Sequence, residues 1–181
     1  SGFPPHPHRD MEIITYVRKG AITHKDSMGN EGRTAAGDVQ VMSAGTGVRH
    51  AEYNLEDETT TLFQIWVLPR AAGGAPSWGA KPFPQGDRSG RFAVLASGYE
   101  ADADALRIRA DARLLGATVQ AGETLTYDLD DDRFAYLVPA TGRVEINGQP
   151  FEARDGAAIR GGGSVVIKAL EDSEIVLVDS Q

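Results

Sequence analysis

The feature that most constrains the fold of this chain is a long series of short apolar runs, each bounded by glycine or polar turn residues. Runs such as 13–17, 39–42 and 61–68 are rich in β-branched and aromatic residues, as β-strands are. No segment combines a sustained 3.6-residue apolar period with helix caps, so we expect few and short helices. The chain therefore predicts an all-β protein, built as an antiparallel sandwich or barrel.

The runs fall into two series that are separated by a connection rich in proline and glycine, residues 70–90. Tight turns are expected at 26–30 and 35–38, where glycine follows or precedes Asp, Asn or Ser. The second series comprises the strands expected at 92–96, 106–108, 113–119, 134–138, 142–148, 164–168 and 174–178. A faint echo between the two series indicates a duplicated β-fold. We therefore expect an N-terminal domain over 1–85 and a C-terminal domain over 91–181.

Composition narrows the functions that the chain can have. The net charge of −8 argues against direct binding to nucleic acid or to an anionic membrane, which needs clustered Lys and Arg. No stretch approaches the ~18 apolar residues of a membrane helix. The chain contains no cysteine, so disulfides and thiolate metal sites are excluded and any metal must take nitrogen and oxygen ligands. We expect a cytoplasmic location.

Two short matched pieces carry the strongest functional signal. His6-Pro7-His8 and His50-Ala51-Glu52 each place two metal-ligand types at positions i and i+2. Alternate side chains of a β-strand point to the same face, so two such strands side by side would aim four ligands at one point. Three imidazoles and one carboxylate would leave two open positions on an octahedral ion, enough for dioxygen and a substrate oxygen. Structural zinc sites are usually closed and often use cysteine, so a reactive metal is the better interpretation.

The carboxylate ligand has two candidates in the sequence. Glu12 lies four residues after His8, an even spacing that would place it on the same face of a continued strand. We favour Glu52 and keep Glu12 as an alternate ligand or a residue that supports the ligands. The fourth histidine, His24, precedes an expected turn, and we expect it to be exposed and outside the metal site.

Other motifs have plain structural interpretations. Gly45-Thr46-Gly47 lacks the following helix of a phosphate loop and is expected to be a tight turn that leads to His50. The acidic stretch 128–132 lacks the pattern of an EF-hand and is expected to be a solvated loop. Trp66 and Trp78 could belong either to the core or to a pocket lining.

With these residues laid out, the chain resembles the pirin family of the cupin superfamily. The resemblance runs through residues 2–12, 15–17, 26–30, 37–52 and 64–69, including the sequence Phe3-Pro4-Pro5-His6-Pro7-His8. It is dense up to Pro69 and looser from Arg91 onward, and it looks closest to bacterial pirin-like proteins with quercetinase-type activity.

The resemblance implies two tandem cupin β-barrels of the double-stranded β-helix or jelly-roll type, with one metal in the first. The ligand pattern of the family falls on His6, His8, His50 and Glu52. It implies one divalent transition metal, with Fe(II) expected first and Cu, Ni, Mn or Zn as alternatives. Pirin-like proteins carry further residues before the His-x-His segment, so we expect the complete protein to have an N-terminal segment that packs on this domain.

Two functions of different classes follow as expectations. The first is a metal-dependent dioxygenase that opens a flavonol such as quercetin with O2, with Glu52 accepting the proton of the substrate hydroxyl. The second is a redox-sensing regulator, resembling a transcriptional cofactor, that acts through a protein partner. Another cupin chemistry, such as isomerisation or hydrolysis, is a weaker third. We expect a monomer in every case.

Overall fold

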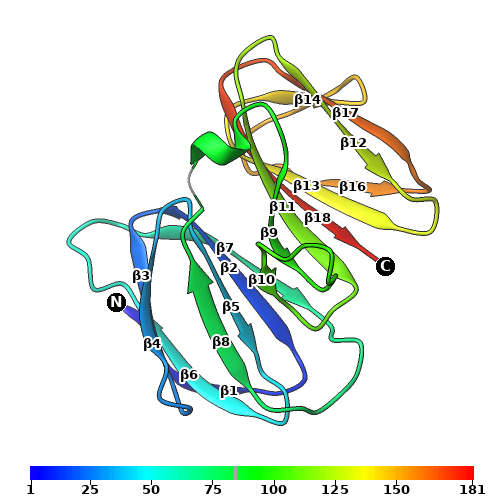
Figure 1. Cartoon of the computed structure of the whole chain (residues 1–181). Coiled ribbons are helices and arrows are strands. Elements are labelled where there is room, and N and C mark those ends of the chain that lie inside the picture. The colour runs from blue at the N-terminus through cyan, green and yellow to red at the C-terminus, as the bar shows by residue number, and fades with distance from the viewer. Residues whose placement is uncertain (84) are drawn as a thin grey trace. The chain divides into compact units, whose positions relative to one another are not determined.

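The computed structural model describes residues 1–83 and 85–181, which form almost entirely β-structure (Figure 1). The described residues contain one short 3-10 helix, η1 (Gln85–Arg88). None of their helices has the length and apolar character needed to cross a bilayer. The all-β class predicted from the sequence is confirmed.

The chain divides into two compact units. The first comprises Ser1–Pro84 together with Ala96–Asp111, and the second comprises Gln85–Leu95 together with Ala112–Gln181. The chain thus returns to the first unit after residue 95, whereas the sequence predicts a single crossing between 85 and 91. The assignment of 1–85 and 91–181 as two cupin domains stays a prediction.

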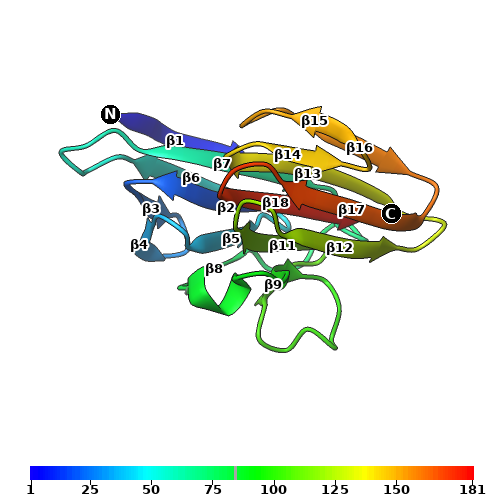
Figure 2. The same cartoon turned by 90° about the horizontal axis from the view of Figure 1, so that it is seen from above.

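The first unit contains two four-stranded antiparallel sheets, labelled in Figures 1 and 2. One has the order β1 (Gly2–His8), β6 (Val48–Tyr53), β3 (Ala21–Asp26), β4 (Glu31–Ala35). The other has the order β7 (Thr61–Val67), β2 (Glu12–Lys19), β5 (Val39–Ser43), β8 (Ser77–Lys81). The two sheets are not joined by strand pairing in the described part of the chain, so the unit is an open sandwich rather than a closed barrel.

Strand β8 lies within the connection expected at residues 70–90, where the sequence analysis expects no strand. Its sequence, Ser-Trp-Gly-Ala-Lys, has no apolar alternation, and it becomes a strand by pairing with β5 at the sheet edge. Pro84, in the same connection, lies outside the described residues.

Burial in the first unit follows the strand period. The central strand β2 is buried on both faces from Glu12 to Val17. One face is turned toward the other sheet, and on the opposite face Glu12 contacts Arg109 of the same unit. On the face toward that sheet, Ile13 packs in a buried cluster with Met42 and Val48. Close packing of this kind fixes the polar side chains further along the same face.

The second unit also consists of two sheets. One contains β9 (Ala93–Ser97), β11 (Ala112–Val119), β18 (Ser173–Ser180), β13 (Phe134–Thr141) and β16 (Ala157–Arg160) in that order. Strand β9 crosses from the second unit to the first, where β10 (Leu106–Arg107) pairs with its last residues. The other sheet contains β12 (Thr124–Leu129), β17 (Gly163–Ala169), β14 (Val144–Ile146) and β15 (Gln149–Phe151).

The core of the second unit is a cluster of buried aliphatic side chains contributed by both sheets, including Leu137, Ile167, Ile175 and Leu177. All four histidines of the chain lie before residue 51, so this unit contains none. The histidine-based chemistry of the chain is therefore confined to the first unit.

Candidate metal centre

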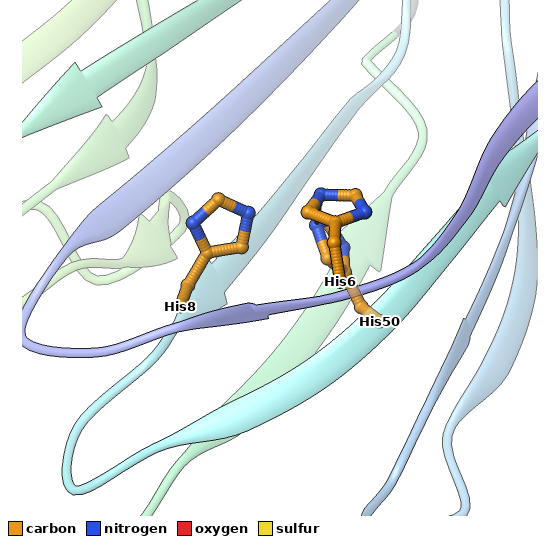
Figure 3. Close-up of side chains that lie close together, drawn as sticks. All are labelled: His6, His8 and His50. Carbon is orange, nitrogen blue, oxygen red and sulfur yellow. Dashed lines mark hydrogen bonds between the residues drawn. The ribbon is translucent and has the colours of Figure 1, made fainter.

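The two strands that carry the matched pieces pair with each other, as the sequence predicts. Strands β1 and β6 are antiparallel neighbours, with His6 opposite His50 and His8 opposite Val48. The pairing is irregular between Phe3 and His6, where two prolines lie. Proline has no N–H to donate and is tolerated at such an edge strand. Figure 3 shows the three imidazole rings rising on the same side of this strand pair.

The three rings are in mutual contact. Ring centroids lie 4.9 Å apart for His6 and His8, 4.4 Å for His6 and His50, and 4.9 Å for His8 and His50. The Nδ1 of His6 donates to the carbonyl oxygen of Pro4 at 2.8 Å, which leaves its Nε2 with a free lone pair. This Nε2 lies 2.8 Å from the Nε2 of His50, so two ring nitrogens converge where a cation or a shared proton satisfies both.

The carboxylate of Glu52 joins the group from the next position of β6 on the same face. It is 3% exposed, and Oε1 lies 3.8 Å from the Nδ1 of His50. Gln40 donates to Oε1 at 2.9 Å and Gln64 donates to Oε2 at 3.1 Å. Both glutamines belong to the opposite sheet, so one sheet supplies the candidate ligands and the other fixes the carboxylate.

Burial shifts the pKa values of His8, His50 and Glu52 toward their neutral forms. Burial, and after it the neighbouring histidines His6, His8 and His24, together lower the pKa of His50 from 6.5 to about 3. Burial also lowers the pKa of His8, with a smaller contribution from His6. The pKa of the Glu52 carboxyl is raised by burial, against the opposing effect of the bonds from Gln64 and Gln40. His8 and His50 are therefore neutral at pH 7, the form that binds metal ions.

The donor set fits a divalent transition metal. One ligand atom from each of His6, His8 and His50 lies within 4.8 Å of the other two. The buried Nδ1 of His50 has no hydrogen-bond partner in the described part of the chain, which is costly unless a ligand completes the site. Imidazole nitrogens with one carboxylate oxygen suit Fe, Cu, Ni and Zn.

Glu12 lies away from this group, so the interpretation of Glu12 as an alternate ligand is wrong. Its Oε1 accepts the backbone N–H of Arg109 at 2.5 Å and the hydroxyl of Ser43 at 2.8 Å. The even spacing from His8 does not apply, because the chain turns at Asp10, whose φ is +47°. β1 and β2 consequently belong to different sheets, and Glu12 projects from the face of β2 opposite to that of Ile13.

His24 is buried beside the site, so the prediction that it is exposed is wrong. Its side chain is 0% exposed, and its ring centroid lies 5.5 Å from that of His50. It lies directly opposite Glu52 across the β3–β6 pair. A signal was present in the sequence, since His24-Lys25-Asp26 is a third piece with ligand types at i and i+2.

An open groove of about 540 Å³ lies beside the site, lined by Pro7, His8, Arg9, Ser27, Thr46, Gly47, Val48 and Arg49. The Gly45-Thr46-Gly47 turn forms one wall, with both glycines at positive φ, and it leads into β6 as the sequence predicts. Trp66 lies edge-on to His8 at 5.1 Å between ring centroids and is 54% exposed. An exposed aromatic ring therefore contacts the candidate ligand His8.

Comparison with known proteins agrees with this geometry. Residues 1–67 match the family described as Pirin, and residues 94–180 match the family described as Quercetinase C-terminal cupin domain. A pirin-like protein of Caulobacter vibrioides is 69% identical over 180 residues, covering 99% of this chain and 78% of that protein. A quercetin 2,3-dioxygenase of Escherichia coli K12 is 37% identical, with 98% and 76% covered.

Among solved structures, the bacterial pirin YhhW of Escherichia coli in complex with nickel(II) matches with a TM-score of 0.91 and 36% identity. The match covers 99% of this chain and 76% of that chain. The fold and the site define a two-unit cupin-type β-protein whose histidines gather in the first unit. Within that class, the chain belongs to the pirin family.

Proposed function

We propose that the chain is a quercetinase-type dioxygenase that opens a flavonol such as quercetin with O2, using one divalent metal held by His6, His8, His50 and Glu52. The observation that carries the proposal is the convergence of three imidazoles with one buried carboxylate on a single sheet face. The quercetin dioxygenase names of its relatives support the substrate class. Iron(II) is the metal proposed first, with Cu, Ni, Mn and Zn as alternatives.

When bound, the metal supplies Lewis acidity, which lowers the pKa of a substrate hydroxyl. The remaining roles belong to the protein. Glu52 accepts the proton of the flavonol 3-hydroxyl, because its carboxylate lies beside His50 within the proposed ligand group. Gln40 and Gln64 hold one carboxylate oxygen each, so the carboxylate keeps its orientation while it takes up the proton.

The groove beside His8 is the proposed substrate position. His8 lines this groove together with Pro7 and Val48, and the exposed ring of Trp66 contacts His8. A flat aromatic molecule such as a flavonol matches such a surface, since aromatic rings gain from stacking and edge contacts. Trp66 donates its indole N–H to Gln64, which fixes the ring relative to the Glu52 carboxylate.

The experiment is an aerobic assay of protein that is separately reconstituted with Fe(II), Cu(II) and Ni(II). We expect the flavonol absorbance to disappear together with an equal amount of dissolved oxygen. Metal content is measured on the same samples. Stoichiometric metal without turnover on any flavonol would rule out the proposal, whereas absence of metal would rule out the site itself.

A second function, a redox-sensing regulator that acts through a protein partner, is favoured by one observation. The described part of the first unit has five well-exposed large apolar side chains: Phe3 at 63%, Met28 at 55%, Leu55 at 67%, Trp66 at 54% and Leu68 at 73%. Phe3 also lies 6.4 Å from His6 between ring centroids, close to the site. A partner that binds the iron(III) and iron(II) forms with different affinity would support this function. The monomeric state and the cytoplasmic location stay predictions.

A further inference from the structure

A second group of metal-ligand side chains lies deeper in the first unit, behind His50. One ligand atom from each of His24, His50 and Glu52 lies within 4.8 Å of the other two, and all three side chains are buried. We propose that these residues form an inner metal-binding position, with His24 as an additional metal ligand of this chain. The outer position is the one formed around His6 and His8.

The first argument is the tautomer of His24. Its Nε2–H donates to Oδ2 of Asp26 at 2.8 Å, so its Nδ1 carries the free lone pair. Asp26 is itself fixed, because its Oδ1 accepts the backbone N–H groups of Met28 at 2.9 Å and Asn30 at 3.1 Å. A carboxylate that orients an imidazole in this way is the usual partner of a metal-binding histidine.

The second argument is that two imidazole nitrogens beside Glu52 lack a hydrogen-bond partner in the described part of the chain. The Nδ1 atoms of His24 and His50 are both buried and make no hydrogen bond in the described part of the chain. Buried polar atoms of this kind are rare, because each one forfeits its interaction with water. Nε2 of His50 faces His6, whereas Nδ1 lies on the side of Glu52, so the ring presents one nitrogen to each position.

The third argument is preorganisation. His24 and Glu52 are direct neighbours across the β3–β6 pair, so the backbone fixes their spacing. The ring of His24 stacks on Trp78 of the opposite sheet at 4.8 Å and 9° between planes. A ligand held by a sheet on one side and by an indole on the other loses little freedom on binding an ion.

The ligand charges suit a divalent cation. Two neutral imidazoles and one carboxylate give the buried site a single negative charge. An unpaired buried charge is costly, and a bound divalent cation would compensate it. The inner and outer positions share the ring of His50, which presents Nδ1 to the inner position and Nε2 to the outer one, and both draw on the carboxylate of Glu52. His24 belongs to the inner position alone, whereas His6 and His8 belong to the outer one.

The test removes the outer position and titrates tag-free protein with Co(II), whose visible absorbance reports its ligands. We expect His6→Ala/His8→Ala to bind about one equivalent of Co(II) through the inner ligands. Adding His24→Ala should weaken binding by about 100-fold or more, since even the partners that support a ligand cost about 10–100-fold. The readout is metal binding alone, so it is independent of flavonol turnover.

Asp26→Asn in the same background tests the tautomer without removing the ring of His24. The amide would donate toward Nε2, which forces the proton of the imidazole onto Nδ1 and blocks that atom as a ligand. We expect binding to weaken by about 10–100-fold. Tryptophan fluorescence and thermal unfolding of the metal-free variants show whether each is folded.

Two results would overturn the inner position. One is a folded His6→Ala/His8→Ala variant that binds no Co(II) at millimolar concentration. The other is a folded triple variant, with His24→Ala added, that binds Co(II) as tightly as the double variant. Absence of flavonol turnover by the metal-loaded parent protein would overturn the proposed function without affecting the evidence for the inner position.

Discussion

Replacement of Gly32 by alanine tests how the two sheets of the first unit meet. Gly32 lies on β4, opposite His24 in the β3–β4 pair. A Cβ at this position would lie 2.3 Å from Cη2 of Trp78, and 3.0 and 3.2 Å from two further atoms of the same ring. The φ of Gly32 lies outside the left-handed region, so alanine can adopt this backbone conformation without strain. The effect of the substitution is therefore the steric overlap of its Cβ with Trp78.

The magnitude follows from that distance. The indole must move by about 1 Å to reach an ordinary contact, and it cannot do so freely because it also stacks on His24. Overpacking of this kind typically costs about 1–3 kcal/mol. For a chain of this size that corresponds to a melting temperature lower by about 2–12 °C.

Thermal unfolding followed by tryptophan fluorescence measures this effect selectively, because both tryptophans of the chain, Trp66 and Trp78, lie in the first unit. Gly79→Ala is the matched control: it is a strand glycine whose added Cβ would lie 3.7 Å from Leu106, an ordinary contact. We expect the control to be within about 0.5 kcal/mol of the parent. A Gly32→Ala protein as stable as the parent would refute the packing argument.

Three further predictions concern the charged and polar groups. Glu52→Gln should lower metal content after dialysis, whereas Glu12→Gln should leave it unchanged and destabilise the protein by about 1.5–3 kcal/mol in urea unfolding, since it weakens bonds to a buried carboxylate. The folded-state pKa of His50, about 3, is below the ordinary 6.5, so the unfolded state holds more protons between these values. The stability of metal-free protein should therefore decrease as pH falls below about 6.5, by at most about 1.4 kcal/mol per pH unit from this group, and a flat profile of urea midpoints from pH 7 to pH 4 would contradict it. Tyr127→Phe removes the hydroxyl that donates to buried Asp179, and should cost about 1–3 kcal/mol in the second unit without changing metal content.

Local sequence pattern predicts the strands of this chain well where apolar residues alternate or cluster. It also predicts the pairing of β1 with β6, because the i, i+2 spacing of ligand types fixes which face each side chain takes. The same parity reasoning is wrong for Glu12, because parity holds only within one strand and a single residue, Asp10, ends that strand with a positive φ.

The surroundings of His24 could not be predicted from local pattern for a different reason. Its burial comes from the neighbours that β3 acquires in the fold, β6 in its own sheet and Trp78 from the opposite one. Which strands become neighbours depends on contacts between residues far apart in the chain. The open sandwich, in place of a closed barrel, is a property of the same long-range kind.

Within the described residues, strand β1 pairs with β6 and stands first in the order of its sheet. Two of the four proposed ligands, His6 and His8, are attached to it, and the other two belong to β6. An ion bound across this pair would therefore cross-link β1 to β6, in addition to the backbone hydrogen bonds between the two strands. Detachment of β1 would then require release of the ion. Metal loading should therefore slow amide hydrogen exchange along β1 relative to the metal-free protein.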